Sequence, residues 1–285
     1  MIGIVILNYN TWNETIKCCE TIEKYVTQEK YCIYVVDNCS PKKMNNLQEK
    51  KLKSNSNIKY ISSKENRGYS AGNNIGVRQA LLDDCEYILI CNSDIEFVDN
   101  SIEKMCNYFK KNASVGIVGP QIYNVDNEFQ PFMMKTKLTA IGKLKNMLLK
   151  TKAAPLVKSF KESFYIEKEL TAPNLVFGVM GCCFMMSKAC AEYLYPWDER
   201  TFLYEEEYII GSILEKSDFD VYVIPSTHVI HAEGKSTGGM SDFAFQCFIN
   251  SEQLYLREYL KTNIIICNMF RIIRKIQRKN EKHNK

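Results

Sequence analysis

The sequence lacks the cysteine and histidine patterns of proteins held together by zinc or by disulfides. Its twelve cysteines occur as scattered singles and two adjacent pairs, with no C-x-x-C spacing. Neither a zinc ribbon nor a disulfide framework is therefore predicted, and reduced thiols in a cytosol are expected. His228 and His231, without a third histidine or a cysteine in the pattern, are weak evidence for a zinc site.

Segments that would export the chain or insert it into a membrane are also missing. The apolar run at 1–7 has no preceding basic region and no small-residue cleavage site, so we expect a first β-strand rather than an export signal. The apolar stretch 175–186 is too short and too often broken by glycine to span a membrane, and it predicts a buried strand. The predicted location is cytoplasmic.

The body of the chain is nearly neutral overall, and net positive charge is concentrated at the end of the sequence. Of a net charge of +4, residues 257–285 carry +7, from nine Lys/Arg and two acidic residues, which leaves −3 for the rest. The few aromatic residues in this basic stretch argue against nucleic-acid binding. Ile265, Met269, Ile272 and Ile276 recur there at helical spacing. This predicts either an interfacial helix on the inner face of the cell membrane or a helix packed on the catalytic domain.

The first hundred residues alternate between short apolar runs and polar stretches of helical character. This alternation predicts an α/β fold in which helices cover a largely parallel sheet. The predicted strands are 2–7, 32–36, 58–62, 87–91 and, later, 221–225. The predicted helices are 13–26, capped by Thr11 or Asn13, then 42–52, and 70–82, capped by Ser70. The Lys-rich segment 129–170 has no clear periodicity and predicts a mobile segment or an inserted helical pair.

Unusual polar residues follow three of the predicted strands. They are Asn8-Tyr9-Asn10, Asp37-Asn38 and Asn92-Ser93-Asp94. Because parallel sheets bind ligands beyond the carboxyl ends of their strands, we expect these residues to face one ligand. Asp94 could hold a divalent cation that also binds a diphosphate, and Asp37 could accept a hydrogen bond from a nucleoside. Structural roles are the alternative: Asp94 as a helix cap and Asp37 as a turn residue.

Two further stretches are suggestive but weak when taken alone. The small-residue loop 66–76 leads into a helix whose first N–H groups could meet a phosphate, although it is neither a P-loop nor a G-x-G-x-x-G motif. Glu205, Glu206 and Glu207 lie among aromatic residues. Partial desolvation there would raise a carboxyl pKa towards that of a general base, whereas the ordinary interpretation is an exposed helical face.

Together and in this order, the motifs resemble family 2 glycosyltransferases of the GT-A fold, in particular the bacterial rhamnosyltransferase-like enzymes that build surface polysaccharides. The resemblance covers residues 2 to about 240 and rests on an ordered set. The set is Val5 to Asn10, Val35 to Ser40, Asn66 to Gly76, Asn92 to Asp94, Gly181 to Met185, Trp197 to Glu199, and Phe202 to Glu207.

The resemblance implies a GT-A type, Rossmann-like mixed sheet in a catalytic domain at 1–240, with a nucleotide-binding half at 1–100 and an acceptor-binding half at 101–240. A helical basic extension at 241–285 follows. It implies Glu207 as the catalytic base, with Glu206 as a competitor, and a Mn²⁺ or Mg²⁺ ion held by Asp94 and by His231 in a His-x-x-Gly-x-Ser stretch ending at Ser236. The implied nucleotide-binding residues are Leu7, Asn8, Tyr9, Asn10, Asp37, Asn66, Gly68, Asn74, Asn92 and Ser93.

The implied reaction is inverting transfer of a sugar from a UDP- or dTDP-sugar to a hydroxyl of a glycan or a polyprenyl-diphosphate-linked acceptor. Two positions depart from the family pattern: the D-x-D motif begins with Asn92, and the usual Asp of the base is Glu207. Because of these departures, a non-catalytic partner subunit that binds nucleotide is an alternative function. A nucleotidyltransferase is a further alternative, but the loop after the first strand lacks the basic, glycine-rich sequence that it needs.

Overall fold

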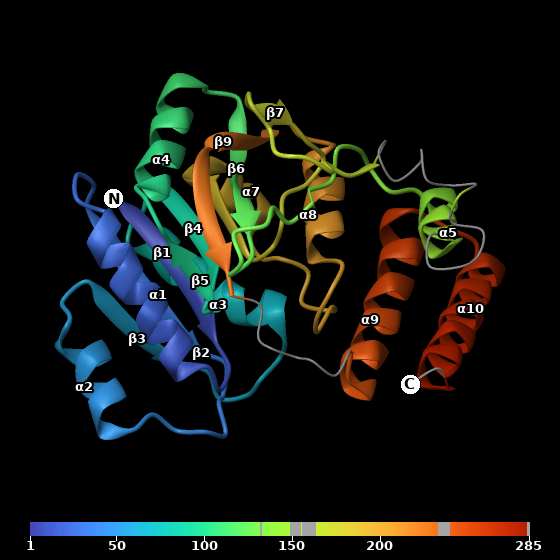
Figure 1. Cartoon of the computed structure of the whole chain (residues 1–285), viewed down its shortest axis with the longest axis horizontal. Helices are drawn as coiled ribbons and strands as arrows, with labels where there is room; N and C mark the ends of the chain where they lie inside the picture. The colour runs from blue at the N-terminus through green and yellow to red at the C-terminus, as the bar shows by residue number, and fades with distance from the viewer. Residues whose placement is uncertain (132, 149–154, 156–163, 233–239, 284–285) are drawn as a thin grey trace.

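A nine-stranded mixed sheet forms the centre of the protein, in a computed structural model that describes residues 1–131, 133–148, 155, 164–232 and 240–283 (Figure 1). The strand order is β3-β2-β1-β4-β8-β6-β9-β5, and β7 pairs with β9. The strands are β1 (Ile2–Asn8), β2 (Tyr31–Asp37), β3 (Ile58–Ser62), β4 (Tyr87–Asn92), β5 (Ile95–Phe97), β6 (Val115–Tyr123), β7 (Asn174–Leu175), β8 (Cys183–Ser187) and β9 (Asp220–His231).

The first four strands are parallel neighbours, in the order β3-β2-β1-β4. They confirm the four strands predicted in the first hundred residues. α1 (Trp12–Tyr25), α2 (Asn46–Ser54) and α3 (Tyr69–Leu82) connect them. The second helix begins at Asn46 rather than Lys42, because Asn45 and Gln48 form a capping box that fixes its start.

The second half of the sheet is mixed. β8 runs antiparallel to both β4 and β6, whereas β6 and β9 are parallel. The single buried strand predicted at 175–186 is wrong, since this stretch contains only the exposed end of β7 and most of β8. Between them, Gly178 forms only an isolated antiparallel bridge with Met134, and the Gly181 N–H donates to the Glu207 carboxylate, so no continuous strand forms.

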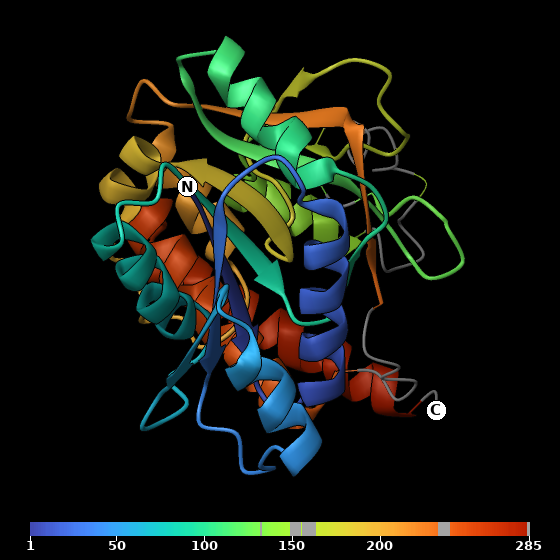
Figure 2. The same ribbon diagram turned by 90° about the vertical axis from the view of Figure 1, so that its left-hand side faces the viewer.

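Helices cover both faces of the sheet, and each face has its own apolar core. α1, α2 and α4 (Ser101–Lys111) enclose one core, and α3, α7 (Lys188–Leu194) and α8 (Glu206–Leu214) enclose the other. Figure 2 shows α1 and α3 on opposite sides of the strands. The sheet is thus a central layer between two sets of helices, and the loops that follow the carboxyl ends of its parallel strands lie between these sets.

The predicted helix caps are only partly confirmed. Thr11 is the N-cap residue of α1, but its side chain does not cap the helix and instead bonds Asn8 and Ser93. The cap of α3 is Gly68, and Ser70 lies inside the first turn with its hydroxyl 3.4 Å from that of Thr201. Asp94 does not cap α4 either, because the N-cap residue of that helix is Asn100.

A helical layer stands beside α8, on the right in Figure 1. It contains α5 (Ala140–Leu148), α9 (Asp242–Leu254), the π-helical turn η2 (Tyr255–Tyr259) and α10 (Ile264–His283). Met147, Leu256, Cys267 and Phe270 form a small apolar core within this layer. One face of α10 is therefore packed on the protein, as one of the two predictions for the tail required. Within the predicted segment 129–170 one helix, α5, is described, and most of 149–163 lies outside the described residues.

Candidate active site

The register of the sheet brings three of the predicted polar loops to one edge. Asn8 pairs with Asp37, and Leu7 pairs with Asn92, so β1, β2 and β4 all end at the same level. The hydroxyls of Ser93 and Thr11 lie 2.8 Å apart and tie two of the loops together. The predicted meeting of these residues at the carboxyl edge is confirmed.

Asn8 and Asp37 hold the loops of this edge in place through buried hydrogen bonds. The Asn8 side chain is fully buried, donates to Ser40 Oγ and Asp37, and accepts from Thr11 and Thr15. Asp37 is also buried and accepts from the Ser40 N–H. Because protein partners occupy these groups, their contact with a nucleotide stays a prediction. Tyr9 is exposed and Asn10 partly exposed, so these two present the loop to solvent.

The small-residue loop before α3 is held against the segment that precedes α8. Gly68 has φ +94°, and a Cβ there would lie 2.3 Å from the Phe202 carbonyl oxygen, so only glycine fits. The Tyr69 N–H donates to the same oxygen and is not available to a phosphate. Asn66 accepts from Asn38 and from the Gly68 N–H.

Asn74 also acts within the protein. Its side chain is buried, accepts from the Trp197 N–H and donates to the Trp197 carbonyl and to Glu199. The residue predicted to shape the nucleotide pocket thereby fixes the Trp197-Asp198-Glu199 motif. A direct contact between Asn74 and a nucleotide stays a prediction.

Asp94 and His231, the two predicted metal ligands, lie together. His231 Nε2 is 3.4 Å from Asp94 Oδ1, because Ile95 and His231 are paired residues of β5 and β9. The Ala232 N–H also donates to the Asp94 carbonyl. His231 Nδ1 is buried and has no hydrogen-bond partner among the described residues. The rest of the predicted stretch, through Ser236, lies outside the described residues.

His228 serves a different purpose from His231. Its ring stacks on Tyr123, with 3.9 Å between the ring centroids, and burial lowers its pKa. It is therefore a neutral stacking residue of the sheet.

The third predicted element, the glutamate run, forms the start of α8. Tyr204 and Glu205 both adopt left-handed backbone conformations, with φ +75° and +72°. Non-glycine residues rarely do so, and such strain persists only where surrounding contacts impose it. Here Glu205 is buried against Lys143 and the ring of Tyr204 packs on that of Phe248, so these contacts hold the backbone that leads into α8.

Glu206 and Glu207 differ in their surroundings. The Glu206 side chain is buried, and its Oε1 has no hydrogen-bond partner in the described part of the chain. Burial, followed by the charge of Glu207, raises the pKa of Glu206 to about 8. Glu207 is partly exposed, its Oε1 accepts from the Gly181 N–H, and burial raises its pKa too. The charge of Glu207 thus opposes ionisation of the neighbouring Glu206.

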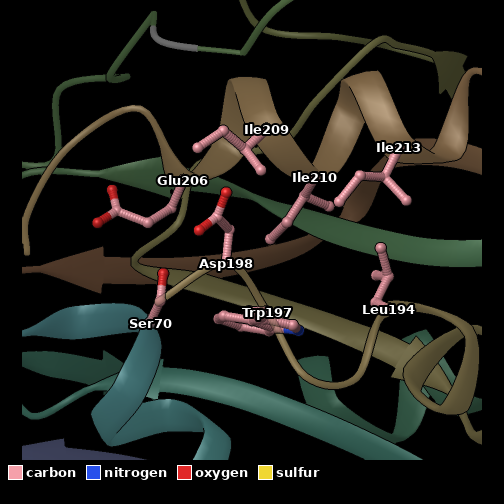
Figure 3. Close-up of a pocket in the computed structure, with 8 residues that line it drawn as sticks. All are labelled: Ser70, Leu194, Trp197, Asp198, Glu206, Ile209, Ile210 and Ile213. Carbon is pink, nitrogen blue, oxygen red and sulfur yellow. The ribbon is translucent and has the colours of Figure 1, made fainter. Parts of the chain in front are cut away.

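A small pocket lies beside Glu206 (Figure 3). Trp197 and the aliphatic side chains of α7 and α8 line one end, and Ser70, Asp198 and Glu206 line the other. Glu207 is not among its lining residues. Glu206 thus borders the interior between α3 and α8, whereas Glu207 turns to the loop that contains Gly181.

Gly181 links the acidic pair to the sheet edge. The Asn92 N–H donates to the Cys182 carbonyl, and the Tyr69 hydroxyl donates to the Gly181 carbonyl. The pKa of the buried Cys182 thiol is raised by burial first, and also by the charges of Asp94 and Glu207. Cys182 therefore lies within electrostatic reach of both the predicted metal ligand and the predicted base.

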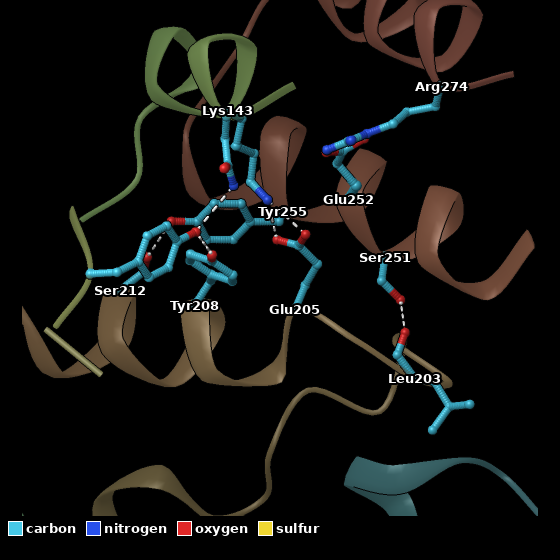
Figure 4. Close-up of polar contacts among 11 residues, drawn as sticks. Lys143, Leu203, Glu205, Tyr208, Ser212, Ser251, Glu252, Tyr255 and Arg274 are labelled. Carbon is cyan, nitrogen blue, oxygen red and sulfur yellow. Dashed lines mark hydrogen bonds and ion pairs between the residues drawn. The ribbon is translucent and has the colours of Figure 1, made fainter. Parts of the chain in front are cut away.

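The sequence did not point to Lys143, which holds the start of α8 from the helical layer (Figure 4). Its Nζ is 2.6 Å from both carboxylate oxygens of Glu205, and both side chains are buried. It also lies over the rings of Tyr208 and Tyr255. Burial raises the pKa of Glu205 although Lys143 opposes the shift. Ser251 adds a hydrogen bond to the Leu203 carbonyl.

Comparison with known sequence families decides the identity. Residues 3–194 match the family described as "Glycosyl transferase family 2". The chain belongs to glycosyl transferase family 2. The predicted resemblance is thereby confirmed. The match ends before Glu206, Glu207 and His231, so their roles stay predictions.

Two curated relatives of this family 2 chain are named as a hexosyltransferase and a rhamnosyltransferase. It is 31% identical over 124 residues to the low-salt glycan biosynthesis hexosyltransferase Agl10 of Haloferax volcanii, covering 43% of this chain and 37% of the relative. It is 22% identical over 155 residues to the N-acetylglucosaminyl-diphospho-decaprenol L-rhamnosyltransferase of Mycobacterium tuberculosis, covering 54% and 49%. The chain thus spans less than half the length of these relatives.

Solved structures confirm the predicted GT-A fold. The structure of GalNAc-T7 with UDP, GalNAc and Mn²⁺ superposes with a TM-score of 0.65 at 14% identity, covering 96% of this chain and 54% of that one. TarS of S. aureus in complex with UDP gives a TM-score of 0.55 at 13% identity, covering 90% and 66%. At such identities the likeness concerns the fold.

Proposed function

We propose that this family 2 enzyme is an inverting, metal-dependent transferase that moves a sugar from a UDP- or dTDP-sugar to an acceptor hydroxyl in surface polysaccharide synthesis. The observation that carries the proposal is the placement of Glu207. It is partly exposed at the start of a helix, has a raised pKa, and is joined through Gly181 and Cys182 to the edge that contains Asp94.

Glu207 accepts the proton of the acceptor hydroxyl in this proposal. The hydrogen bond from Gly181 orients its carboxylate, and its raised pKa makes it a stronger base than an exposed glutamate. Glu206 is the weaker candidate, because it is buried beside Trp197 and retains its proton at neutral pH. Its protonation leaves Glu207 as the charged member of the pair.

Asp94 and His231 fit a divalent cation. They offer a carboxylate oxygen and an imidazole nitrogen 3.4 Å apart, and the buried Nδ1 of His231 is unpaired among the described residues. Within the described part of the chain, no group of three or more His, Cys, Asp or Glu could hold a metal ion by itself. The donor diphosphate would therefore supply further ligands. When bound, Mn²⁺ or Mg²⁺ would neutralise charge on the leaving diphosphate.

We further propose a glycan or polyprenyl-diphosphate-linked acceptor on the cytoplasmic side of a membrane. The M. tuberculosis relative is named for a decaprenol-linked substrate, which motivates this acceptor class. All twelve cysteines are free thiols, in agreement with a reducing compartment. No helix within the described residues is long and apolar enough to cross a membrane.

A thermal-shift screen tests the proposal. Purified protein is heated with UDP-, dTDP- and GDP-sugars, each with and without Mn²⁺ or Mg²⁺. A ligand at about a hundred times its dissociation constant stabilises the native state by about 2.7 kcal/mol. We expect a metal-dependent shift with UDP- or dTDP-sugars that Asp94→Asn removes. A shift that is independent of metal, or that survives Asp94→Asn, would contradict the metal assignment.

Donor turnover separates the enzyme from a non-catalytic partner subunit. An enzyme releases the nucleoside diphosphate from its bound donor with a suitable acceptor, and slowly with water alone. A partner subunit would give the thermal shift without any release.

A further inference from the structure

The outer face of α10 is an apolar stripe. Ile265, Met269, Ile272 and Ile276 follow one another at intervals of four, three and four residues, which aligns them along one side of the helix. Their exposed fractions are 74%, 41%, 59% and 55%. In Figure 1, α10 lies on the outer side of α9, away from the sheet. The stripe is therefore a large apolar surface on the outside of the molecule.

The opposite side of α10 is already occupied. Cys267 and Phe270 are buried in the small core with Met147 and Leu256. Arg274 forms two hydrogen bonds to Glu252 of α9, at 2.7 and 3.1 Å. These contacts fix the rotation of the helix, so the stripe faces outward because the packing of α10 requires it.

The basic residues of α10 divide in the same way. Arg274, Arg278 and Lys282 are engaged by α9 and the residues just before it, through Glu252, the Met240 carbonyl and Asp242. Arg271, Lys275 and Lys279 are exposed, recur every four residues and border the apolar stripe. These three take part in no ion pair with any described residue. A basic stripe beside an apolar stripe is complementary to the surface of a lipid bilayer, where acyl chains lie beneath anionic headgroups.

We propose that this face of α10, the apolar stripe together with Arg271, Lys275 and Lys279, docks on the surface of an anionic phospholipid bilayer. The helix lies in the plane of the interface, with the isoleucines among the acyl chains and the basic stripe at the phosphates. The charge of +7 over residues 257–285 favours an anionic surface and opposes pairing of this face with a second copy. The proposal rests on the proposed function only in that a lipid-linked acceptor would be met there.

Vesicle sedimentation of the full chain tests the docking. Wild-type protein is expected to sediment with phosphatidylcholine vesicles that contain phosphatidylglycerol, to remain in solution with phosphatidylcholine alone, and to dissociate as salt is raised. One variant replaces the four stripe residues (Ile265→Gln, Met269→Gln, Ile272→Gln and Ile276→Gln). A second replaces the basic stripe (Arg271→Gln, Lys275→Gln and Lys279→Gln).

Binding by the apolar-stripe variant should fall more than tenfold. Since each basic residue near an anionic surface contributes about fivefold, the three-residue charge variant should lose about a hundredfold. Matched controls replace exposed residues of the catalytic region: Leu47→Gln, Leu82→Gln and Val125→Gln for the apolar set, and Lys30→Gln, Lys50→Gln and Lys111→Gln for the charges. Both controls should sediment like wild type.

Three results would overturn the docking. The first is wild-type protein that does not sediment with anionic vesicles. The second is an apolar-stripe variant that sediments like wild type. The third is an apolar-stripe variant that is monomeric under conditions where the wild type is a dimer. The last would assign the face to a second copy. Donor turnover without vesicles, measured on the same preparations, keeps the two proposals apart. Turnover without sedimentation contradicts only the docking, and sedimentation without nucleotide binding or turnover contradicts only the transferase.

Discussion

The carboxyl edge of the parallel strands and the start of α8 differ in how their buried polar groups are paired. At the edge, Asn8 and Asp37 are buried, and neighbouring loops satisfy their polar atoms. At the start of α8, the Glu206 carboxyl is buried, one of its oxygens has no partner among the described residues, and its pKa is raised to about 8. At the edge, hydrogen bonds within the protein offset the free-energy cost of burying these polar side chains, so the edge is a rigid platform. The start of α8 retains an electrostatic cost, which is a property of sites that transfer protons.

Glu207→Gln should produce the largest change. General-base catalysis contributes about a hundred- to ten-thousand-fold, so turnover should fall by that factor while the donor-induced thermal shift remains. Glu206→Gln should change turnover far less, because Glu206 already carries a proton at neutral pH. Steady-state kinetics with donor and acceptor measure both variants, and Glu192→Gln on the exposed side of α7 is the control. A larger loss in Glu206→Gln than in Glu207→Gln would reverse the assignment.

Lys143→Met should be the most destabilising change at the start of α8. Removing one partner of a buried ion pair typically costs about 3–5 kcal/mol, because the other charge stays buried without compensation. Lys137→Met is the matched control, since its partner Glu215 lies at the exposed end of the same helix. Such surface pairs are worth at most about 1 kcal/mol. Urea unfolding measures both variants.

A double variant shows whether the loss comes from the unpaired carboxylate. Lys143→Met combined with Glu205→Gln should be more stable than Lys143→Met alone, because no buried charge then remains. Equal stability of the single and double variants would mean that Lys143 acts through packing on Tyr208 and Tyr255 rather than through charge.

The same contrast separates what the sequence could predict from what it could not. The four parallel strands were predictable because each is a short apolar run closed by polar residues, and polar residues after neighbouring parallel strands must share an edge. Lys143 was not predictable, since it lies in a Lys-rich segment and its partner is 62 residues away. Asn74 shows a second limit of the sequence. Its place in a small-residue loop suggests a ligand contact, and nothing in the sequence indicated its bonds to the Trp197 backbone, 123 residues away.

Asn8→Ala should damage the platform without changing the chemistry of α8. The substitution leaves the Thr11 N–H and the Ser40 hydroxyl without the partners that Asn8 provides. Unsatisfied buried groups cost about 1–3 kcal/mol, so the unfolding midpoint should fall measurably. Tyr9→Ala, at the exposed neighbouring position, should leave stability unchanged and weaken donor binding. The framework role of Asn8 would be refuted if Asn8→Ala unfolded at the wild-type urea concentration.

The pH dependence of stability is the most specific difference between the two regions. Glu206 has a pKa of about 8 in the folded protein, against 4.5 as its ordinary value. Between these pH values, Glu206 holds a proton in the native state that it has released in the unfolded chain. The stability that Glu206 contributes therefore falls as pH rises, and it is lost above about pH 8. Glu206→Gln, which cannot ionise, should gain stability relative to wild type as pH is raised from 5 to 9, across that range. Urea titrations at a series of pH values would measure this difference, with Glu192→Gln as an exposed control that should run parallel to wild type. Parallel curves for Glu206→Gln and wild type would mean that Glu206 ionises in the folded protein as easily as in water, and the contrast between the two regions would then disappear.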